Sequence, residues 1–226
     1  MLAVESKWIK MILDRFPPEE VSPVLNVGSS TEHFRKHVQA HIDRNVFAPL
    51  RARKCAVVHL DLKAADGVDV VGDLTEPVFQ ARMKSQAVRL VMCSNLLEHI
   101  PDEHRTTLCH AISEVILPGG YLLVTVPQSY PYHPDPIDTM FRPAPGELAA
   151  YFPGLDVVEA QLVQRRSTNG RDLARRAAGL GLNLLRGAVP VWWGPAAAEA
   201  RHHRASIRHW LRPYSVSCVL MRKQDS

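Results

Sequence analysis

The fold of this chain is decided by Val24-Leu25-Asn26-Val27-Gly28-Ser29-Ser30-Thr31-Glu32. Mostly apolar residues lead into a glycine, then into small hydroxyl-bearing residues, and then into a helical pattern. This order is typical of a buried strand, a tight turn and a helix start. At such a place an α/β sheet presents backbone N–H groups to a ligand.

A helix is expected directly after this turn. Ser29 and Glu32 have the spacing of a capping box, so the helix should begin at about Ser30. Phe34 and Val38 recur at helical spacing and should lie on its inner face.

Strand and helix patterns alternate through the first half of the chain. Four further apolar runs indicate strands, at Cys55–Leu60, Val68–Val71, Val88–Cys93 and Tyr121–Val126, the last stopped by Pro127. This rhythm favours an α/β fold, with a parallel sheet and helices on both faces. The late apolar runs Leu155–Val163 and Ser215–Met221 lack the rhythm and favour an antiparallel hairpin at one edge of the sheet.

Composition sets the class of protein. The 226 residues, 46% hydrophobic and 22% charged, fit a single domain over 1–226. The four cysteines form no C-x-x-C pair, so we expect reduced, buried thiols. The N-terminus resembles neither a signal peptide nor a membrane span, and we expect a cytoplasmic protein.

A glycine and two aspartates follow three of the expected strands. Gly28 leaves room for a ligand at the backbone, Asp61 can accept both hydroxyls of a ribose, and Asp73 can bind an adenine amine. Each also has a simpler explanation. Gly28 can merely turn the chain, Asp61 can be a solvated turn residue, and Asp73 can cap the next helix.

Two later motifs make the pattern specific. Cys93-Ser94-Asn95-Leu96-Leu97-Glu98-His99-Ile100-Pro101 and Leu117-Pro118-Gly119-Gly120-Tyr121-Leu122 follow in order after Gly72-Asp73-Leu74. Together, over about residues 20–165 and 214–223, the chain resembles the class I S-adenosylmethionine-dependent methyltransferases, small-molecule enzymes of the methyltransferase-11-like type. The resemblance implies a Rossmann-like, seven-stranded, mostly parallel sheet whose last strand is antiparallel, with a helical insert before that strand.

The resemblance also implies a cofactor site for S-adenosylmethionine. Gly28 and Ser29 would approach the methionine part, Asp61 the ribose and Asp73 the adenine. Ser94 and Asn95 would line the cleft beside the sulfonium. The full set of expected cofactor residues is Asn26, Gly28, Ser29, Ser30, Asp61, Leu62, Asp73, Leu74, Ser94 and Asn95.

The first motif departs from the family pattern. Asn26 stands where the family usually has an acid, and Ser30 and Glu32 stand where it usually has glycines. Two hypotheses therefore remain open. The chain either transfers a methyl group to an oxygen or nitrogen of a small molecule, or is a non-catalytic, methyltransferase-like binding subunit with a weakened cofactor site.

The loop after the fifth strand is proline-rich, and we expect it to cover the cleft. Its candidate lid residues are Tyr130, Tyr132, Asp135, Asp138 and Arg142. His133 is the first candidate for a general base and His99 the second, because histidine titrates near neutral pH. His133, Asp135 and Asp138 could instead ligate a metal. We favour a lid with Asp138 and Arg142 paired and expect no metal.

A basic insert occupies residues 166–212. Residues 165–213 hold ten arginines against Asp172 and Glu199, and helices are expected over Leu173–Leu185 and Ala196–Leu211. Such a segment can contact an anionic membrane, but a helical cover over the sheet edge is favoured. No RNA-binding module is recognisable, so we expect a small-molecule acceptor, no nucleic-acid partner, and a monomer or homodimer.

Overall fold

The computed structural model describes residues 1–134, 137–165, 177–179, 181, 201–205, 207, 209 and 212–225. These residues form a seven-stranded sheet in the order β3-β2-β1-β4-β5-β7-β6. The strands are β1 (Val24–Val27), β2 (Val57–Asp61), β3 (Val70–Val71), β4 (Val88–Ser94), β5 (Ile116–Ser129), β6 (Leu155–Gln164) and β7 (Ser215–Lys223).

Helices and helical turns join and cover these strands. They are α1 (Ala3–Leu13), α2 (Pro18–Val21), α3 (Ala48–Ala52), α4 (Pro77–Lys84), α5 (Asp102–Val115), α6 (Pro145–Ala149), the π-helical turns η1 (Phe34–Val38) and η2 (Asp43–Phe47), and the 3-10 turn η3 (Leu97–His99). No helix of the described residues is long and apolar enough to cross a membrane.

The strand directions confirm the expected α/β architecture. β1 runs parallel to both β2 and β4, and β4 runs parallel to β5. β7 is antiparallel to both of its neighbours, β5 and β6. From β1 the strands β2 and β3 are added on one side of the sheet, and β4 is added on the other side of β1. The direction in which strands are added therefore reverses between β1 and β4, and at such a point a parallel sheet forms a crevice for a ligand.

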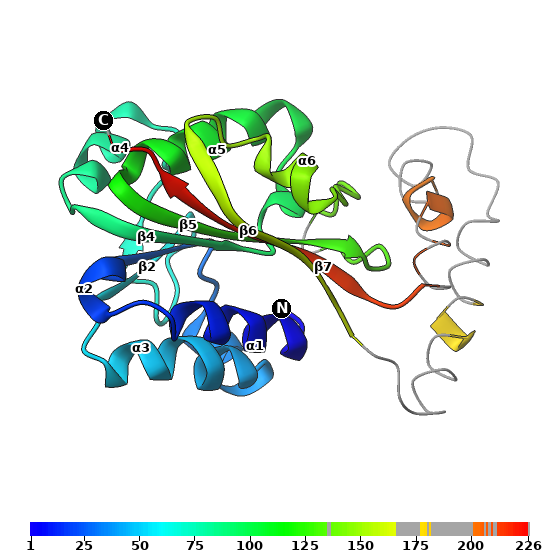
Figure 1. Ribbon diagram of the computed structural model, residues 1–226. Coiled ribbons are helices and arrows are strands. Elements are labelled where there is room, and N and C mark those ends of the chain that lie inside the picture. Colours follow the sequence, from blue (N-terminus) through cyan, green and yellow to red (C-terminus); the bar gives the residue numbers. More distant parts are fainter. Residues whose placement is uncertain are drawn as a thin grey trace.

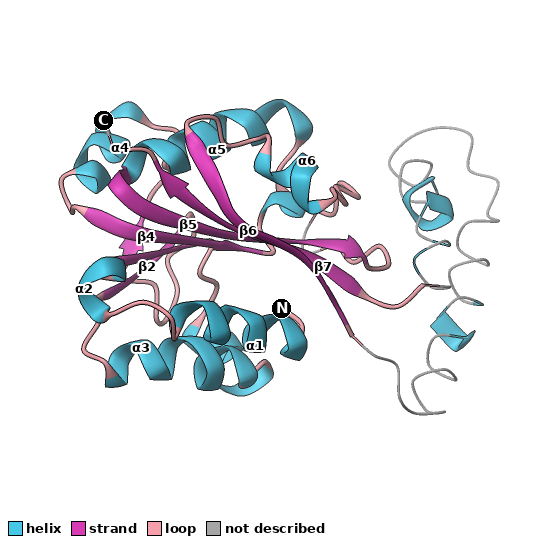
Figure 2. Cartoon of the chain, in the orientation of Figure 1, coloured by secondary structure: helices cyan, strands magenta, loops and turns pink. Residues whose placement is uncertain are grey.

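Helices cover both faces of the sheet (Figures 1 and 2). α1, α2 and α3 lie against one face, and α4, α5 and α6 lie against the other. Each face has its own buried apolar cluster. In β4 the two clusters alternate residue by residue, with Val91 facing one and Met92 the other. A strand buried on both faces reads as a continuous apolar run, which is why β4 was recognisable in sequence.

Some element boundaries differ from those expected. The first strand begins at Val24, because Val21 belongs to α2. β5 continues through Pro127 to Ser129, with a register irregularity between these two residues. Proline has no N–H to donate, and the break in the ladder accommodates it without ending the strand. The expectation for Val38 was wrong, because this side chain is 61% exposed.

The four cysteines are buried and unpaired, as expected. Most of the basic insert lies outside the described residues, including its three tryptophans and most of its two expected helices. In its described part, residues 201–205 are helical.

Candidate active site

The turn after β1 does not contain the expected capping box. The Ser29 hydroxyl donates to the Ser30 carbonyl, and the Glu32 carboxylate pairs with Lys36. The cap is instead the Thr31 hydroxyl, which accepts a hydrogen bond from the backbone N–H of Phe34 at 3.0 Å. Ser29 and Glu32 have the spacing of a capping box. Glu32 instead forms an ion pair with Lys36, four residues further along the same helical segment.

Asp61 and Arg35 hold this turn from two sides. The Asp61 carboxylate accepts the Ser30 backbone N–H at 2.9 Å. The Arg35 guanidinium, which is buried, donates to the carbonyls of Ser29, Ser30 and Gly67 at 2.8, 2.6 and 2.7 Å. Arg35 therefore ties the turn after β1 to the loop before β3.

The expected cofactor residues meet around one cavity of about 1060 Å³ at the carboxyl edge of the sheet. All ten of them line it: Asn26, Gly28, Ser29, Ser30, Asp61, Leu62, Asp73, Leu74, Ser94 and Asn95. They come from the ends of β1, β2, β3 and β4, which parallel pairing brings to one edge. His99, His133 and Tyr130 line the same cavity.

Two non-glycine residues of the cavity have left-handed backbone angles. Ser30 has φ +56° and Asn95 has φ +51°. Such angles are costly for residues with a Cβ and persist where surrounding contacts hold them. Asp61 and Arg35 hold Ser30, as described above. Asn95 donates its side-chain amide to Glu5 at 2.7 Å and its backbone N–H to the Thr125 carbonyl at 2.9 Å.

Gly28 is needed for a reason that the sequence did not show. Its φ is +68°, and a Cβ there would lie 2.8 Å from the Leu96 side chain. Leu96 itself lines the cavity. Because Gly28 has no side chain, Leu96 of the segment after β4 can pack directly against its backbone.

Asn26 is paired within the sheet. Its side-chain amide donates to Nδ1 of His59, on the neighbouring strand β2, at 3.1 Å. Burial lowers the pKa of His59 to about 4, so the ring is neutral and its Nδ1 can accept this bond. Asn26, which stands where the class I methyltransferases usually have an acid, thus has its own hydrogen-bond partner in His59.

A buried carboxylate approaches the cleft from α1. Glu5 is fully buried and accepts hydrogen bonds from the Leu2 backbone N–H at 2.8 Å, from Asn95 at 2.7 Å and from the Thr125 hydroxyl at 2.7 Å. It joins the N-terminal helix to the ends of β4 and β5. The Glu5 carboxylate therefore lies directly behind Asn95, which lines the cavity.

Two observations test whether a nucleoside cofactor fits. The Ser94 hydroxyl is buried in the cavity wall and has no hydrogen-bond partner, so a polar ligand could satisfy it. Asp73 uses Oδ1 to accept from the backbone and hydroxyl of Thr75 at 2.8 and 2.7 Å. Oδ2 of Asp73 takes no part in that turn. The residues present fit the expected group.

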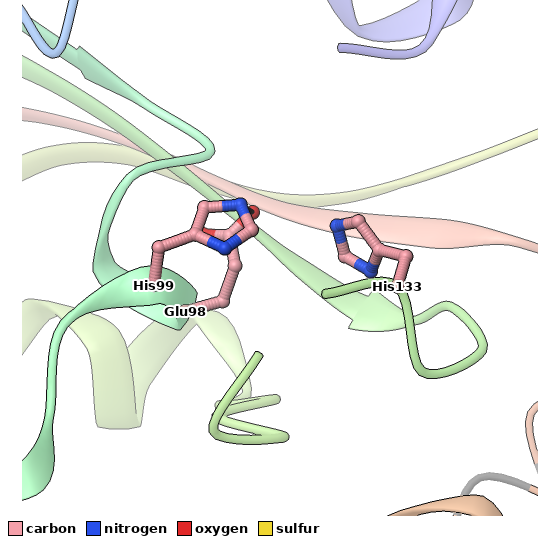
Figure 3. Close-up of side chains that lie close together, drawn as sticks. All are labelled: Glu98, His99 and His133. Atoms are coloured by element: carbon pink, nitrogen blue, oxygen red, sulfur yellow. Dashed lines mark ion pairs between the residues drawn. The ribbon is translucent and has the colours of Figure 1, made fainter. Parts of the chain in front are cut away.

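Glu98, His99 and His133 converge at one part of the cavity (Figure 3). Glu98 and His99 lie on η3, and His133 lies on the segment after β5. One ligand-type atom from each falls within 4.8 Å of the others. Glu98 is fully buried with no hydrogen-bond partner for either carboxylate oxygen, and burial raises its pKa to about 8.

The expected lid contains the expected ion pair. Arg142 donates to Asp138 at 2.6 Å, with both side chains buried. Burial acts to raise the pKa of Asp138, but hydrogen bonds from His133 and Arg142 outweigh it and hold that pKa below its usual range. The Tyr132 ring packs against His203 of the insert, with centroids 5.0 Å apart. Asp135 lies outside the described residues.

Three site residues were missed in sequence. No role was assigned to Arg35 or Glu5 from the sequence, and only their burial distinguishes them from other charged residues of helical segments. Glu98 stood inside the quoted Asn-Leu-Leu-Glu-His-Ile motif but had no role assigned. An acid that directly follows two leucines, three positions before a proline, was the available signal.

The chain resembles known proteins in structure but not in sequence. No protein-family model matches the chain, and no curated protein matches it in sequence. A solved coclaurine N-methyltransferase, bound to N-methylheliamine and SAH, has a TM-score of 0.54 at 16% identity, covering 97% of this chain and 72% of that one.

Two further solved structures are similar. A putative sarcosine dimethylglycine methyltransferase from Galdieria sulphuraria has a TM-score of 0.51 at 12% identity, covering 98% of this chain and 85% of that one. The 1,6-didemethyltoxoflavin-N1-methyltransferase of Burkholderia thailandensis, with 1,6-didemethyltoxoflavin and S-adenosylhomocysteine bound, has a TM-score of 0.50 at 15% identity, covering 98% and 79%. Strand order, strand direction and these likenesses together show that the chain has the fold of the class I S-adenosylmethionine-dependent methyltransferases.

Proposed function

We propose that this protein binds S-adenosylmethionine and transfers its methyl group to an oxygen or nitrogen of a small molecule. One observation carries the proposal. Ten residues chosen for the cofactor from separate strand ends line a single cavity, whose wall holds the unpartnered Ser94 hydroxyl. The structural neighbours described above include two methyltransferases with SAH bound, which supports the same cofactor here.

The chain's own residues would bind and orient the reactants. The cofactor supplies an activated methyl group, so the protein's task is mainly positioning in a dry cleft. The turn at Gly28 would hold the methionine part, Asp61 the ribose and Asp73 the adenine. Asn95, bonded to Glu5, would stand beside the sulfonium, where this buried carboxylate offsets the missing acid at Asn26.

The acceptor would enter beside the expected lid. Tyr130 and His133 line the cavity from the segment after β5. If the acceptor is a weakly acidic hydroxyl, His133 is the first candidate for its base and His99 the second. The lid and residues 166–212 would select a small acceptor. We further propose a cytoplasmic protein, a monomer or homodimer, without a nucleic-acid partner. Membrane contact through 166–212 is the less favoured role of that segment.

Calorimetry with S-adenosylmethionine and S-adenosylhomocysteine tests the proposal. We expect saturable binding of both ligands to the full chain. The absence of heat at millimolar ligand would overturn the proposed enzyme. Methyl transfer to a panel of small hydroxyl and amine compounds would then identify the acceptor class.

A second function is favoured by the first motif. Asn26 is uncharged and paired to His59, and Leu96 lies over Gly28. A non-catalytic binding subunit with a weakened cofactor site would have both features. Ligand-independent thermal stability, together with no methyl transfer to any compound of the panel, would support this alternative over the enzyme.

A further inference from the structure

We propose that Glu98, His99 and His133 bind a divalent transition-metal ion. Their ligand-type atoms lie within 4.8 Å of one another and face the cavity. One carboxylate and two imidazoles form a donor set used by zinc enzymes and by non-haem iron enzymes. Among the residues that the structure describes, this is the one such group of three. The inference departs from the sequence expectation of no metal.

The ring orientation of His99 suits a metal ligand at Nε2. Its Nδ1 contacts the Ile137 carbonyl, which can only accept, so Nδ1 carries the proton. In the neutral ring the lone pair is then on Nε2, which lies 3.8 Å from Oε1 of Glu98. Metal-binding histidines are oriented in this way, with one N–H donated to a backbone carbonyl.

His133 has the same arrangement. Its Nδ1 lies 3.2 Å from the Pro131 carbonyl and 3.0 Å from the Asp138 carboxylate, and both of these groups accept. In the neutral ring the proton is therefore on Nδ1, and Nε2 carries the lone pair. A carboxylate behind the imidazole is one of the usual outer partners of a metal-binding histidine. Arg142 fixes that carboxylate in turn, at 2.6 Å.

Glu98 gives an independent reason to expect a ligand. It is fully buried, and neither of its oxygens has a hydrogen-bond partner. An unpartnered buried acid is costly and calls for an explanation. A cation would supply the missing partner. Ligand atoms around zinc lie about 3.3 Å apart. The ligand atoms of this cluster lie within 4.8 Å of one another, so the widest pair would have to close by up to about 1.5 Å on binding.

The site also bears on the acceptor, a consequence that rests on the proposed function. Three protein ligands leave open positions on the ion, as in catalytic metal sites. An acceptor with an oxygen or nitrogen donor, such as a phenol or a hydroxy acid, could fill one of them. The ion would use the lone pairs that base catalysis needs, so His99 and His133 would act as ligands rather than bases.

The test is metal binding by the full chain, measured without S-adenosylmethionine. Chelator-treated protein is titrated with Co²⁺ and Zn²⁺, and Mg²⁺ serves as the hard-cation comparison. We expect one ion per chain, micromolar or tighter, with a visible Co²⁺ absorption band and no comparable Mg²⁺ binding. Glu98→Gln, His99→Gln and His133→Gln should each weaken binding by at least about tenfold.

The matched control is His104→Gln. His104 lines the same cavity but is exposed and lies outside the cluster. It should bind cobalt as the wild type does. Glu98→Gln keeps the shape of the side chain, and circular dichroism checks that each variant folds. No cobalt binding by the wild type, wild-type affinity in Glu98→Gln and His133→Gln, or an equal loss in His104→Gln would each overturn the proposal. Calorimetry with S-adenosylmethionine is scored separately, so either proposal can fail alone.

Discussion

Single residues decide how the turn after β1 is held. The backbone of Ser30 is left-handed, and Asp61 and Arg35 fix it through its N–H and its carbonyl. Asp61 therefore has two tasks, because the proposed ribose contact and the turn depend on the same carboxylate. A carboxylate has two oxygens and about four acceptor sites, which is enough for both.

Replacing Asp61 tests the register of this site. Asp61→Ala should weaken S-adenosylmethionine binding by about 1–3 kcal/mol, or roughly 5- to 150-fold, because hydrogen bonds to a charged group are lost. Calorimetry measures the dissociation constant. Asp69→Ala is the control, because Asp69 accepts the His59 backbone N–H and does not line the cavity. An unchanged constant in Asp61→Ala would contradict the assignment of the end of β2 to the ribose.

Elements are joined at the site by buried charged side chains. Glu5 joins α1 to the ends of β4 and β5, and Arg105 of α5 donates to carbonyls of Leu97 and Ile100 around η3. The segment after β5 depends on the Asp138–Arg142 pair. Removing one partner of such a pair leaves a buried charge without compensation.

The Asp138–Arg142 pair should therefore be costly to break. Asp138→Asn and Arg142→Met should each lower the free energy of unfolding by about 3–5 kcal/mol. The double variant should lose less than the two single losses combined, because it leaves no unpaired charge. Urea denaturation measures all three.

The exposed Lys10–Asp14 pair is the comparison. Lys10→Met should cost at most about 1 kcal/mol, because water screens exposed ion pairs. Additive effects of Asp138→Asn and Arg142→Met, or costs as small as that of Lys10→Met, would contradict the role of the buried pair.

At the scale of the whole molecule, the sheet order places the site. The order of strands across the sheet reverses between β1 and β4. The cavity opens there, with walls from four strand ends. Stability of this arrangement depends on both buried faces, and a titrating group, His59, packs against Phe47 of one of them with ring centroids 4.8 Å apart.

His59 should make global stability depend on pH. Its pKa is lowered from 6.5 to about 4, so below pH 6.5 the unfolded chain binds a proton that the folded chain resists. The contribution of neutral His59 to the free energy of unfolding is complete above pH 6.5 and is lost as the pH falls toward 4. Between pH 7 and pH 5 the free energy of unfolding should fall by about 2 kcal/mol.

Urea denaturation at several pH values measures this dependence. His59→Gln is the matched variant, since its amide oxygen can accept the Asn26 hydrogen bond without titrating. The pH dependence between 7 and 5 should be smaller in His59→Gln by about the same 2 kcal/mol. Equal pH dependence in both proteins would contradict the burial of a neutral histidine.

Local sequence patterns were enough to predict much of the fold and the ten expected cofactor residues that line the cavity. Apolar runs, strand-end acids and the Gly28 turn depend on neighbours in sequence, so β1, β2, β4 and the cavity-lining set could be predicted. The prediction of a capping box at Ser29 was wrong, because the Glu32 carboxylate pairs with Lys36.

Other features depend on residues far apart in the chain. Glu5 meets Asn95 and Thr125 across 90 and 120 positions, and no local pattern encodes such a contact. The same holds for Glu98 and His133. The positions of most strands along the chain and the residues at their ends were predictable from the amino-acid sequence, because periodicity and turn chemistry are local. Tertiary packing alone decided that Glu98 is buried without a partner beside two oriented imidazoles, because burial and proximity arise only when separate elements pack together.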